Sequence, residues 1–186
     1  MPVDPARPVT AFQDLRRIAA GPLPQVAPAA REAGPGVLVF DDATGHLVDI
    51  DLQSLAYEQQ AFEAAREPEP EPAPRGRGRP KLGVVAREVT LLPRHWEWLA
   101  TQPGGASVAL RKLVEQARRD NAGADARRLA IEGAYRVMSV LAGDLPRFEA
   151  ASRALFARDR AAFAAEIAGW PADLTAYLLR LAFGPE

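Results

Sequence analysis

The residues best suited to bind a ligand are basic and are concentrated in the middle of the 186-residue chain. Residues 75–119 contain 10 Arg or Lys and 3 Glu, a net charge of +7, whereas residues 1–74 contain 5 Arg and 12 Asp or Glu, a net charge of −7. Residues 120–186 contain 8 Arg and 9 acidic residues, so the whole chain has a net charge of −1. GC-rich coding explains the preference for Arg over Lys, but it does not explain the clustering. The positive block therefore predicts an anionic partner such as nucleic acid.

Residues 74–81 hold the most closely spaced basic side chains, in the order Pro-Arg-Gly-Arg-Gly-Arg-Pro-Lys. This segment resembles the AT-hook, a short DNA-binding motif. Glycine in the motif lets the backbone lie deep in the narrow minor groove of A·T-rich DNA, where flanking arginines follow the negative potential. By this resemblance, the DNA-binding residues are Arg75, Arg77, Gly78, Arg79, Pro80 and Lys81. The alternative is a solvated basic linker that only separates two parts of the chain.

A predicted strand and two predicted helices follow the basic segment. Residues 84–92 are apolar and β-branched, which favours a strand, and Pro93 marks the start of a short helix. Gly104 and Gly105 end that helix, and apolar residues at helical spacing predict a second helix over 106–119. This order of elements resembles the ribbon-helix-helix family of bacterial DNA-binding proteins.

The resemblance implies a way for these elements to bind DNA. In that family, two chains pair their strands into an antiparallel ribbon that lies in the major groove, and the amides that start the second helix hold a phosphate. The implied assembly is a homodimer through residues 84–120. The implied contact residues are Arg87, Thr90, Ser107 and Arg111. Glu88 departs from the family pattern, because it lies on the outward face of the strand, where phosphates would repel it.

The apolar positions of the two helices predict a small core. Trp96 lies near the same helix face as Leu99 and Ala100 and is expected to be buried, whereas Trp98 lies elsewhere on the helix. The second helix carries an apolar stripe of Ala106, Ala109, Leu110, Leu113 and Ala117. The alternative interpretation is an ordinary domain in which the arginines are simply solvated.

The whole chain predicts an α+β fold with four parts. We expect a small acidic α+β domain over 1–66, a linker over 67–83, the strand-helix-helix unit over 84–120 and a helical bundle over 121–186. The linker is rich in Glu and Pro and then in Arg and Gly. Its first half cannot form a helix, because each proline lacks an amide donor and favours an extended neighbour.

The N-terminal domain is predicted to contain hairpins and helices. Its clearest pattern is a hairpin with strands over 37–40 and 47–52, joined by a turn in which Gly45 adopts a positive φ. The weaker expectations are a hairpin at 11–12 and 17–19 and helices over 25–31 and 54–66.

The C-terminal part is predicted to be helical. The expected helices are 124–142, 146–157, a helix capped by Asp159, and 172–183. Their short connections favour antiparallel neighbours in a small bundle.

The sequence contains no recognised catalytic or cofactor-binding motif. It has no cysteine, which excludes disulfides, cysteine-zinc sites and thiol nucleophiles. His46 and His95 lack a ligand partner at metal-site spacing, and the acidic residues Asp41, Asp42, Asp49 and Asp51 are best explained as the wet face of a hairpin. We therefore predict no enzyme activity, no cofactor and no metal. Neither a membrane span nor a signal peptide is recognisable, so a cytoplasmic location is expected.

The chain as a whole resembles a widespread bacterial family of unknown function, chiefly over residues 37–52 and 77–119. The leading hypothesis is a cytoplasmic DNA-binding protein that regulates transcription. The alternative is a protein–protein interaction module with neither nucleic-acid nor catalytic activity. A third, weaker hypothesis is an enzyme whose site is assembled from scattered residues.

Overall fold

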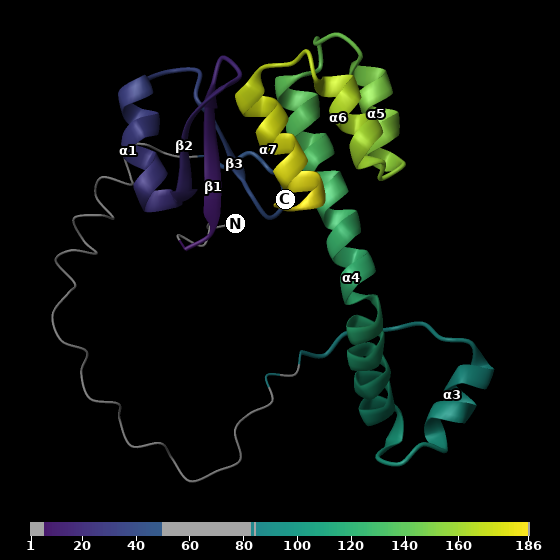
Figure 1. Cartoon of the computed structure of the whole chain (residues 1–186). Helices are drawn as coiled ribbons and strands as arrows, with labels where there is room; N and C mark the ends of the chain where they lie inside the picture. Colours follow the sequence, from purple (N-terminus) through teal and green to yellow (C-terminus); the bar gives the residue numbers. More distant parts are fainter. Residues whose placement is uncertain (1–5, 50–82, 84, 186) are drawn as a thin grey trace, which may run out of the picture. The chain divides into compact units, whose positions relative to one another are not determined.

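The structure is a computed structural model that describes residues 6–49, 83 and 85–185. Its contacts divide the chain into two units (Figure 1). Unit 1 comprises Met1–Arg66 and Gly123–Glu186, and unit 2 comprises Glu67–Ala122. The predicted linker over 67–83 and the predicted helix over 54–66 fall almost entirely outside the described residues.

A three-stranded antiparallel sheet forms the N-terminal part of unit 1. Its strands are β1 (Pro8–Gln13), β2 (Arg16–Pro22) and β3 (Leu38–Asp41), in the order β2-β1-β3. The weaker predicted hairpin is thus confirmed and lengthened. Asp14 and Leu15 both have positive φ, 47° and 66°, at the turn between β1 and β2. A two-residue turn with positive φ at both positions has a backbone twist that matches the right-handed twist of the flanking strands.

The central strand β1 is buried on both faces. Val9 and Ala11 face one hydrophobic cluster with helix α1 (Leu23–Ala33), which confirms the helix predicted over 25–31. Phe12 lies in a second cluster with residues of the C-terminal helices. In Figure 1, α1 and the C-terminal helix α7 accordingly lie on opposite sides of the sheet.

The C-terminal helices of unit 1 follow the predicted order. They are the end of α4 (Gly105–Leu141), α5 (Phe148–Phe156), α6 (Arg160–Ile167) and α7 (Ala172–Phe183). Asp159 caps α6 as predicted, with its side chain accepting a hydrogen bond of 2.9 Å from the amide of Ala162. The α+β fold class is therefore confirmed.

The sheet and the C-terminal helices share one core, although the sequence suggested separate domains over 1–66 and 121–186. Phe12 and Phe40 pack in the same buried cluster as Met138, Leu155 and Tyr177. The sheet and the C-terminal helices bury their apolar faces against each other, and this contact forms the shared core.

The predicted hairpin over 37–52 is only partly present. β3 pairs with the returning chain through a single bridge, Phe40 to Leu47, and a hydrogen bond of 2.8 Å from the amide of Val48 to the carbonyl of Val39. Residues 48 and 49 form no strand, and residues 50–52 lie outside the described part of the chain. The expected turn is confirmed, because Gly45 has a φ of +68°.

A single 37-residue helix, α4, replaces the two predicted helices over 106–119 and 124–142. The predicted break fails because no proline lies between them and one interior glycine costs only about 1 kcal/mol. Side chains also support the helix there. Gln116 donates to Asp120 at 2.8 Å, and Asn121 donates to the carbonyl of Ala117 at 2.8 Å.

Unit 2 contains α3 (Pro93–Ala100), a short turn and the first part of α4. Residues 85–92 form no strand, which corrects the prediction for the single chain. A strand needs a hydrogen-bonded neighbour, and the described residues provide none for this segment. Among the described residues, no helix is long and apolar enough to cross a membrane.

The predicted core of unit 2 is also only partly present. Leu99 and Ala109 are buried as expected, at 2% and 8% exposure. Trp96 and Leu113 were expected in the core but are 42% and 48% exposed, and Ala117 is exposed as well. The short helix α3 and the first part of α4 offer too few neighbours to enclose side chains of this size, so these residues remain at the surface of the single chain.

Candidate nucleic-acid interface

The two helices of unit 2 are joined by a turn that depends on two glycines. Pro93 occupies the first turn of α3, where its fixed φ suits a helix start. After Ala100 the chain reverses through Gly104 and Gly105, whose φ values are +86° and +75°. Only glycine adopts such angles at little cost, so the sequence fixes the start of α4 at this point.

Ser107 and Arg111 lie one turn apart at the start of α4, as the helical spacing requires. Both are exposed, and the Arg111 guanidinium donates a hydrogen bond of 3.3 Å to the Ser107 hydroxyl. The amides of a first helical turn carry a partial positive charge. A hydroxyl, a guanidinium and this partial charge are thus brought together on one exposed surface.

Charged side chains surround this surface, and all of them are exposed in the described part of unit 2. The basic residues are Arg87, Arg94, Arg111, Lys112, Arg118 and Arg119. The acidic residues are Glu88, Glu97, Glu115 and Asp120. Six basic and four acidic residues give this part a net charge of +2.

The other predicted contact residues are not joined to Ser107 and Arg111. Arg87 and Thr90 are exposed in the irregular segment before α3, and no hydrogen bond between described residues links them to the start of α4. The AT-hook-like residues Arg75, Arg77, Gly78, Arg79, Pro80 and Lys81 lie outside the described residues.

An apolar groove is the feature of unit 2 that the sequence interpretation missed. It has a volume of about 280 Å³ and is lined by Leu91, His95, Trp98, Leu99, Leu110 and Leu113. Its signal in the sequence was the second tryptophan, because Trp98 lies off the face predicted to be buried and is 50% exposed. The groove places His95 in apolar surroundings at the surface of α3.

The interpretation of the acidic residues as the solvent-exposed face of a hairpin is wrong for Asp42. Its carboxylate accepts hydrogen bonds from the hydroxyls of Thr10 at 2.8 Å and Tyr177 at 2.9 Å, and from the guanidinium of Arg180 at 3.1 Å. Burial, together with the Asp42 carboxylate, raises the pKa of Tyr177 far above its usual range. Sequence patterns could not reveal this cluster, because Tyr177 lies 135 positions from Asp42.

The carboxylate of Asp41 also has several partners. It accepts hydrogen bonds from the amides of Ala43 at 2.8 Å and Thr44 at 2.9 Å, and it pairs with Arg7 at 3.4 Å. Both aspartates therefore have structural partners within the fold. Within the described ranges, no group of three or more His, Cys, Asp or Glu side chains is placed to hold a metal ion.

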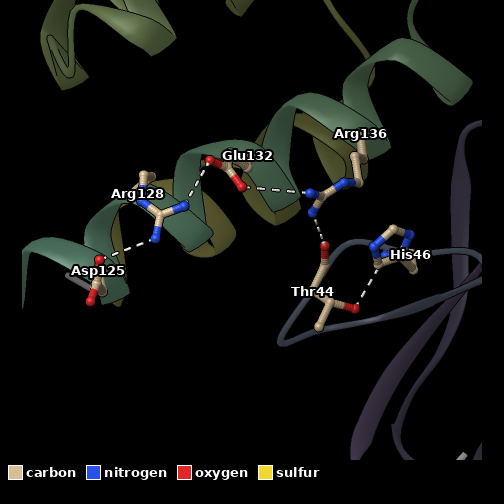
Figure 2. A network of polar contacts seen from close by, with 6 residues as sticks. All are labelled: Thr44, His46, Asp125, Arg128, Glu132 and Arg136. Atoms are coloured by element: carbon tan, nitrogen blue, oxygen red, sulfur yellow. Dashed lines mark hydrogen bonds and ion pairs between the residues drawn. The ribbon is translucent and has the colours of Figure 1, made fainter. Parts of the chain in front are cut away.

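A chain of charged residues along α4 ends on the turn after β3 (Figure 2). Arg128 pairs with Asp125 at 3.1 Å and with Glu132 at 3.4 Å, and Glu132 pairs with Arg136 at 3.6 Å. Arg136 then donates a hydrogen bond of 2.7 Å to the carbonyl of Thr44. These contacts orient the turn on the helix and leave no unpaired charge in the chain of contacts.

The same turn approaches α4 so closely that glycine is required at position 45. A Cβ on Gly45 would lie 2.2 Å from the carbonyl oxygen of Gly133. His46 follows this contact and is exposed, with its amide 3.4 Å from the Thr44 hydroxyl. The turn therefore acts as a structural support for the sheet, and His46 takes part through its backbone.

These features define an α+β protein with two kinds of exposed surface in unit 2, one basic and one apolar. Residues 8–182 match the model of a family described as "uncharacterized protein conserved in bacteria" (DUF2239), so the chain belongs to this bacterial family. The expected resemblance to a bacterial family of unknown function is thereby confirmed. Searches among curated proteins and among solved structures give no significant match.

Proposed function

We propose that this protein binds DNA through unit 2 and the basic segment 75–81, and that it regulates transcription. The observation that carries the proposal is the exposed group of Ser107 and Arg111 at the amide end of α4. Phosphate oxygens are the natural ligands of such a group, because amides, a hydroxyl and a guanidinium all donate hydrogen bonds.

The distribution of charge supports the same proposal. Arg111, Lys112, Arg118 and Arg119 follow one another along the exposed part of α4 in unit 2. The positive charge of Arg118 is partly neutralised by Glu115 at 3.0 Å, whereas Arg111 donates a hydrogen bond to a neutral hydroxyl. Arg111 and Lys112 are therefore the described residues best placed to meet a phosphate.

A matched pair of double variants tests the contribution of these two residues. R111A/K112A removes two positive charges from α4 in unit 2, and R127A/R128A removes two from the same helix in unit 1. Fluorescence anisotropy with labelled genomic fragments measures binding at two salt concentrations. We expect R111A/K112A to weaken binding by about tenfold or more and to reduce the salt slope by about 1–2, since each phosphate contact contributes about 0.9.

The R127A/R128A control distinguishes a contact from a general charge effect. We expect it to bind DNA within about twofold of the wild type. Equal losses in both variants would mean that only overall charge matters, and would contradict a contact surface at the start of α4.

The apolar groove of unit 2 favours a second candidate function, a protein–protein interaction module. Trp98 and Leu113 line this groove and are half exposed. A pull-down that captures a defined protein, from a chain that binds no DNA at low salt, would favour this candidate over DNA binding.

A further inference from the structure

Unit 1 contains a pocket between the turn after β3 and helix α4. Its volume is about 480 Å³, which lies within the usual range of small-molecule sites. Both elements contribute to its lining side chains, which are His46, Leu47, Tyr135, Arg136, Ser139 and Val140. The pocket therefore combines an imidazole, a guanidinium and hydroxyls with aliphatic and aromatic side chains.

The polar side chains of this pocket have hydrogen-bond donors that the fold does not use. Arg136 donates to the carbonyl of Thr44 at 2.7 Å and pairs with Glu132 at 3.6 Å. A guanidinium has more N–H donors than these two contacts use. Within the described residues, the His46 imidazole and the Ser139 hydroxyl have no hydrogen-bond partner. Three groups able to donate hydrogen bonds thus line one pocket.

Contacts within unit 1 hold these groups in place before any ligand arrives. Figure 2 shows the Arg136 guanidinium directed at the turn that carries His46. Gly45, the neighbour of His46, approaches Gly133 of α4 so closely that a Cβ would clash with its backbone. The turn is therefore fixed against the helix at the pocket. A site fixed in this way loses less conformational entropy on binding.

The apolar side of the pocket is left in water by the fold. Leu47 and Val140 are 49% and 48% exposed. The Tyr135 ring contacts the rings of Phe156 and Phe148 on α5, with centroids 5.0 and 6.4 Å away, which holds it in position. A ligand with an apolar body would remove Leu47 and Val140 from water, and this favours binding.

We propose that this pocket binds a small organic monocarboxylate. The carboxylate accepts hydrogen bonds from Arg136, His46 and Ser139, because a charged acceptor forms the strongest hydrogen bonds with a guanidinium. The apolar body of the ligand covers Leu47 and Val140. The amphipathic lining of the pocket thus matches an amphipathic ligand.

The charges around the pocket favour a single carboxylate over a phosphate. Glu132 pairs with Arg136 at 3.6 Å and with Arg128 at 3.4 Å, and Asp125 pairs with Arg128 at 3.1 Å. Two arginines are thus balanced by two carboxylates. A doubly charged phosphate would be repelled by Glu132, whereas one carboxylate needs only the unused donors. All of these residues belong to unit 1, and the inference does not depend on the proposed DNA binding.

Nuclear magnetic resonance titrations of the full, isotope-labelled chain test the class of ligand. Phenylacetate combines a carboxylate with an apolar body, whereas phenylacetamide lacks the charge and acetate lacks the body. We expect phenylacetate to bind with a Kd in the millimolar range or tighter and to shift the amides of residues 45–47 and 135–140. Phenylacetamide, acetate and inorganic phosphate should each bind at least about fivefold more weakly, since each loses one kind of contact.

Two substitutions on α4 form a matched pair for the same titration. Val140 lines the pocket and is 48% exposed, whereas Leu129 is 49% exposed on the same helix and does not line it. Val140→Asp should raise the Kd of phenylacetate about tenfold or more, because it places a like charge beside the ligand. Leu129→Asp should leave the Kd within about twofold of the wild type. Circular dichroism checks that both variants keep their helix content.

His46→Ala is a second variant that leaves α4 unchanged. His46 is exposed, and its described hydrogen bond uses only its backbone amide. We expect the variant to fold and to raise the Kd of phenylacetate about threefold or more through the loss of one donor.

Several outcomes would overturn the proposal. Phenylacetate might show no binding at millimolar concentrations, or it might shift only residues outside the pocket. Phenylacetamide or phosphate binding as tightly as phenylacetate would refute the carboxylate site. An unchanged affinity in Val140→Asp or His46→Ala, or an equal loss in Leu129→Asp, would do the same. A chain that binds phenylacetate at this pocket but no DNA would support this inference and refute the proposed function.

Discussion

Asp42 shows how single residues hold the sheet against the helices of unit 1. Its carboxylate is 8% exposed and receives three hydrogen bonds, one from Thr10 on β1 and two from Tyr177 and Arg180 on α7. A buried carboxylate is tolerated only when its oxygens are satisfied in this way. The cluster is therefore a structural anchor between the sheet and α7.

The raised pKa of Tyr177 predicts how stability depends on pH. Burial and the Asp42 carboxylate keep the folded phenol protonated, whereas an unfolded tyrosine loses its proton near pH 10.0. Above about pH 10 the unfolded state thus binds fewer protons, and the free energy of unfolding falls by about 1.4 kcal/mol per pH unit. Urea denaturation at a series of alkaline pH values measures this slope.

The Tyr177→Phe variant isolates the contribution of this residue. It keeps the ring that packs against Phe12, with centroids 5.2 Å apart, and removes only the hydroxyl. We expect it to be less stable than the wild type at neutral pH by about 1 kcal/mol. Its stability should lose the alkaline slope, and a slope as steep as that of the wild type would refute this explanation.

At the scale of elements, the close approach of the β3 turn to α4 makes a second prediction. Gly45→Ala places a methyl group 2.2 Å from the Gly133 carbonyl at a φ of +68°. We expect a loss of about 2 kcal/mol or more, since both backbone strain and a clash with backbone act together. Thermal or urea denaturation of the full chain measures the loss.

Gly36→Ala is the matched control for this prediction. Gly36 also has a positive φ, +87°, but nothing lies within 4 Å of the added methyl group. Its expected cost is about 1 kcal/mol, from the backbone conformation. Equal losses in the two variants would show that the close contact with Gly133 adds nothing.

The elements that sequence patterns predicted are those with local signals. Pro93, the Gly104-Gly105 pair and Asp159 each mark a helix boundary through the chemistry of one or two residues, and the structure follows them. One error arose because the answer depends on contacts outside the segment, and the other because local side-chain contacts outweigh one interior glycine. The predicted 84–92 strand needs a partner that the described residues do not offer, and α4 continues through Gly123 because its own side chains support it.

The candidate site was only partly predictable, because some of its contacts join separate elements. Spacing of four residues was enough to place Ser107 beside Arg111 on one face of a helix. The groove at Trp98 and the anchor at Asp42 depend on contacts between separate elements, and neither has a local pattern. Burial of Trp96 was wrongly predicted because a helical stripe does not reveal whether anything covers it.

At the scale of the whole molecule, the charge pattern and the packing divide the chain differently. Residues 1–66 and 123–186 form one unit, whose described residues share a core, whereas the +7 block over 75–119 lies in the other unit together with the acidic segment 67–74. This distribution of charge is the basis of our proposal that unit 2, which includes the basic segment 75–81, binds DNA.

The most direct test of this account is the salt dependence of DNA binding by the full chain. Anisotropy titrations with an A·T-rich and a G·C-rich duplex, at several salt concentrations, measure the affinity and its slope. We predict a log–log slope of about −3 or steeper, since each phosphate contact contributes about 0.9. We also predict tighter binding to the A·T-rich duplex, and a loss of that preference in R75A/R77A/R79A. Absence of binding at low salt, or an unchanged affinity in that variant, would contradict the account.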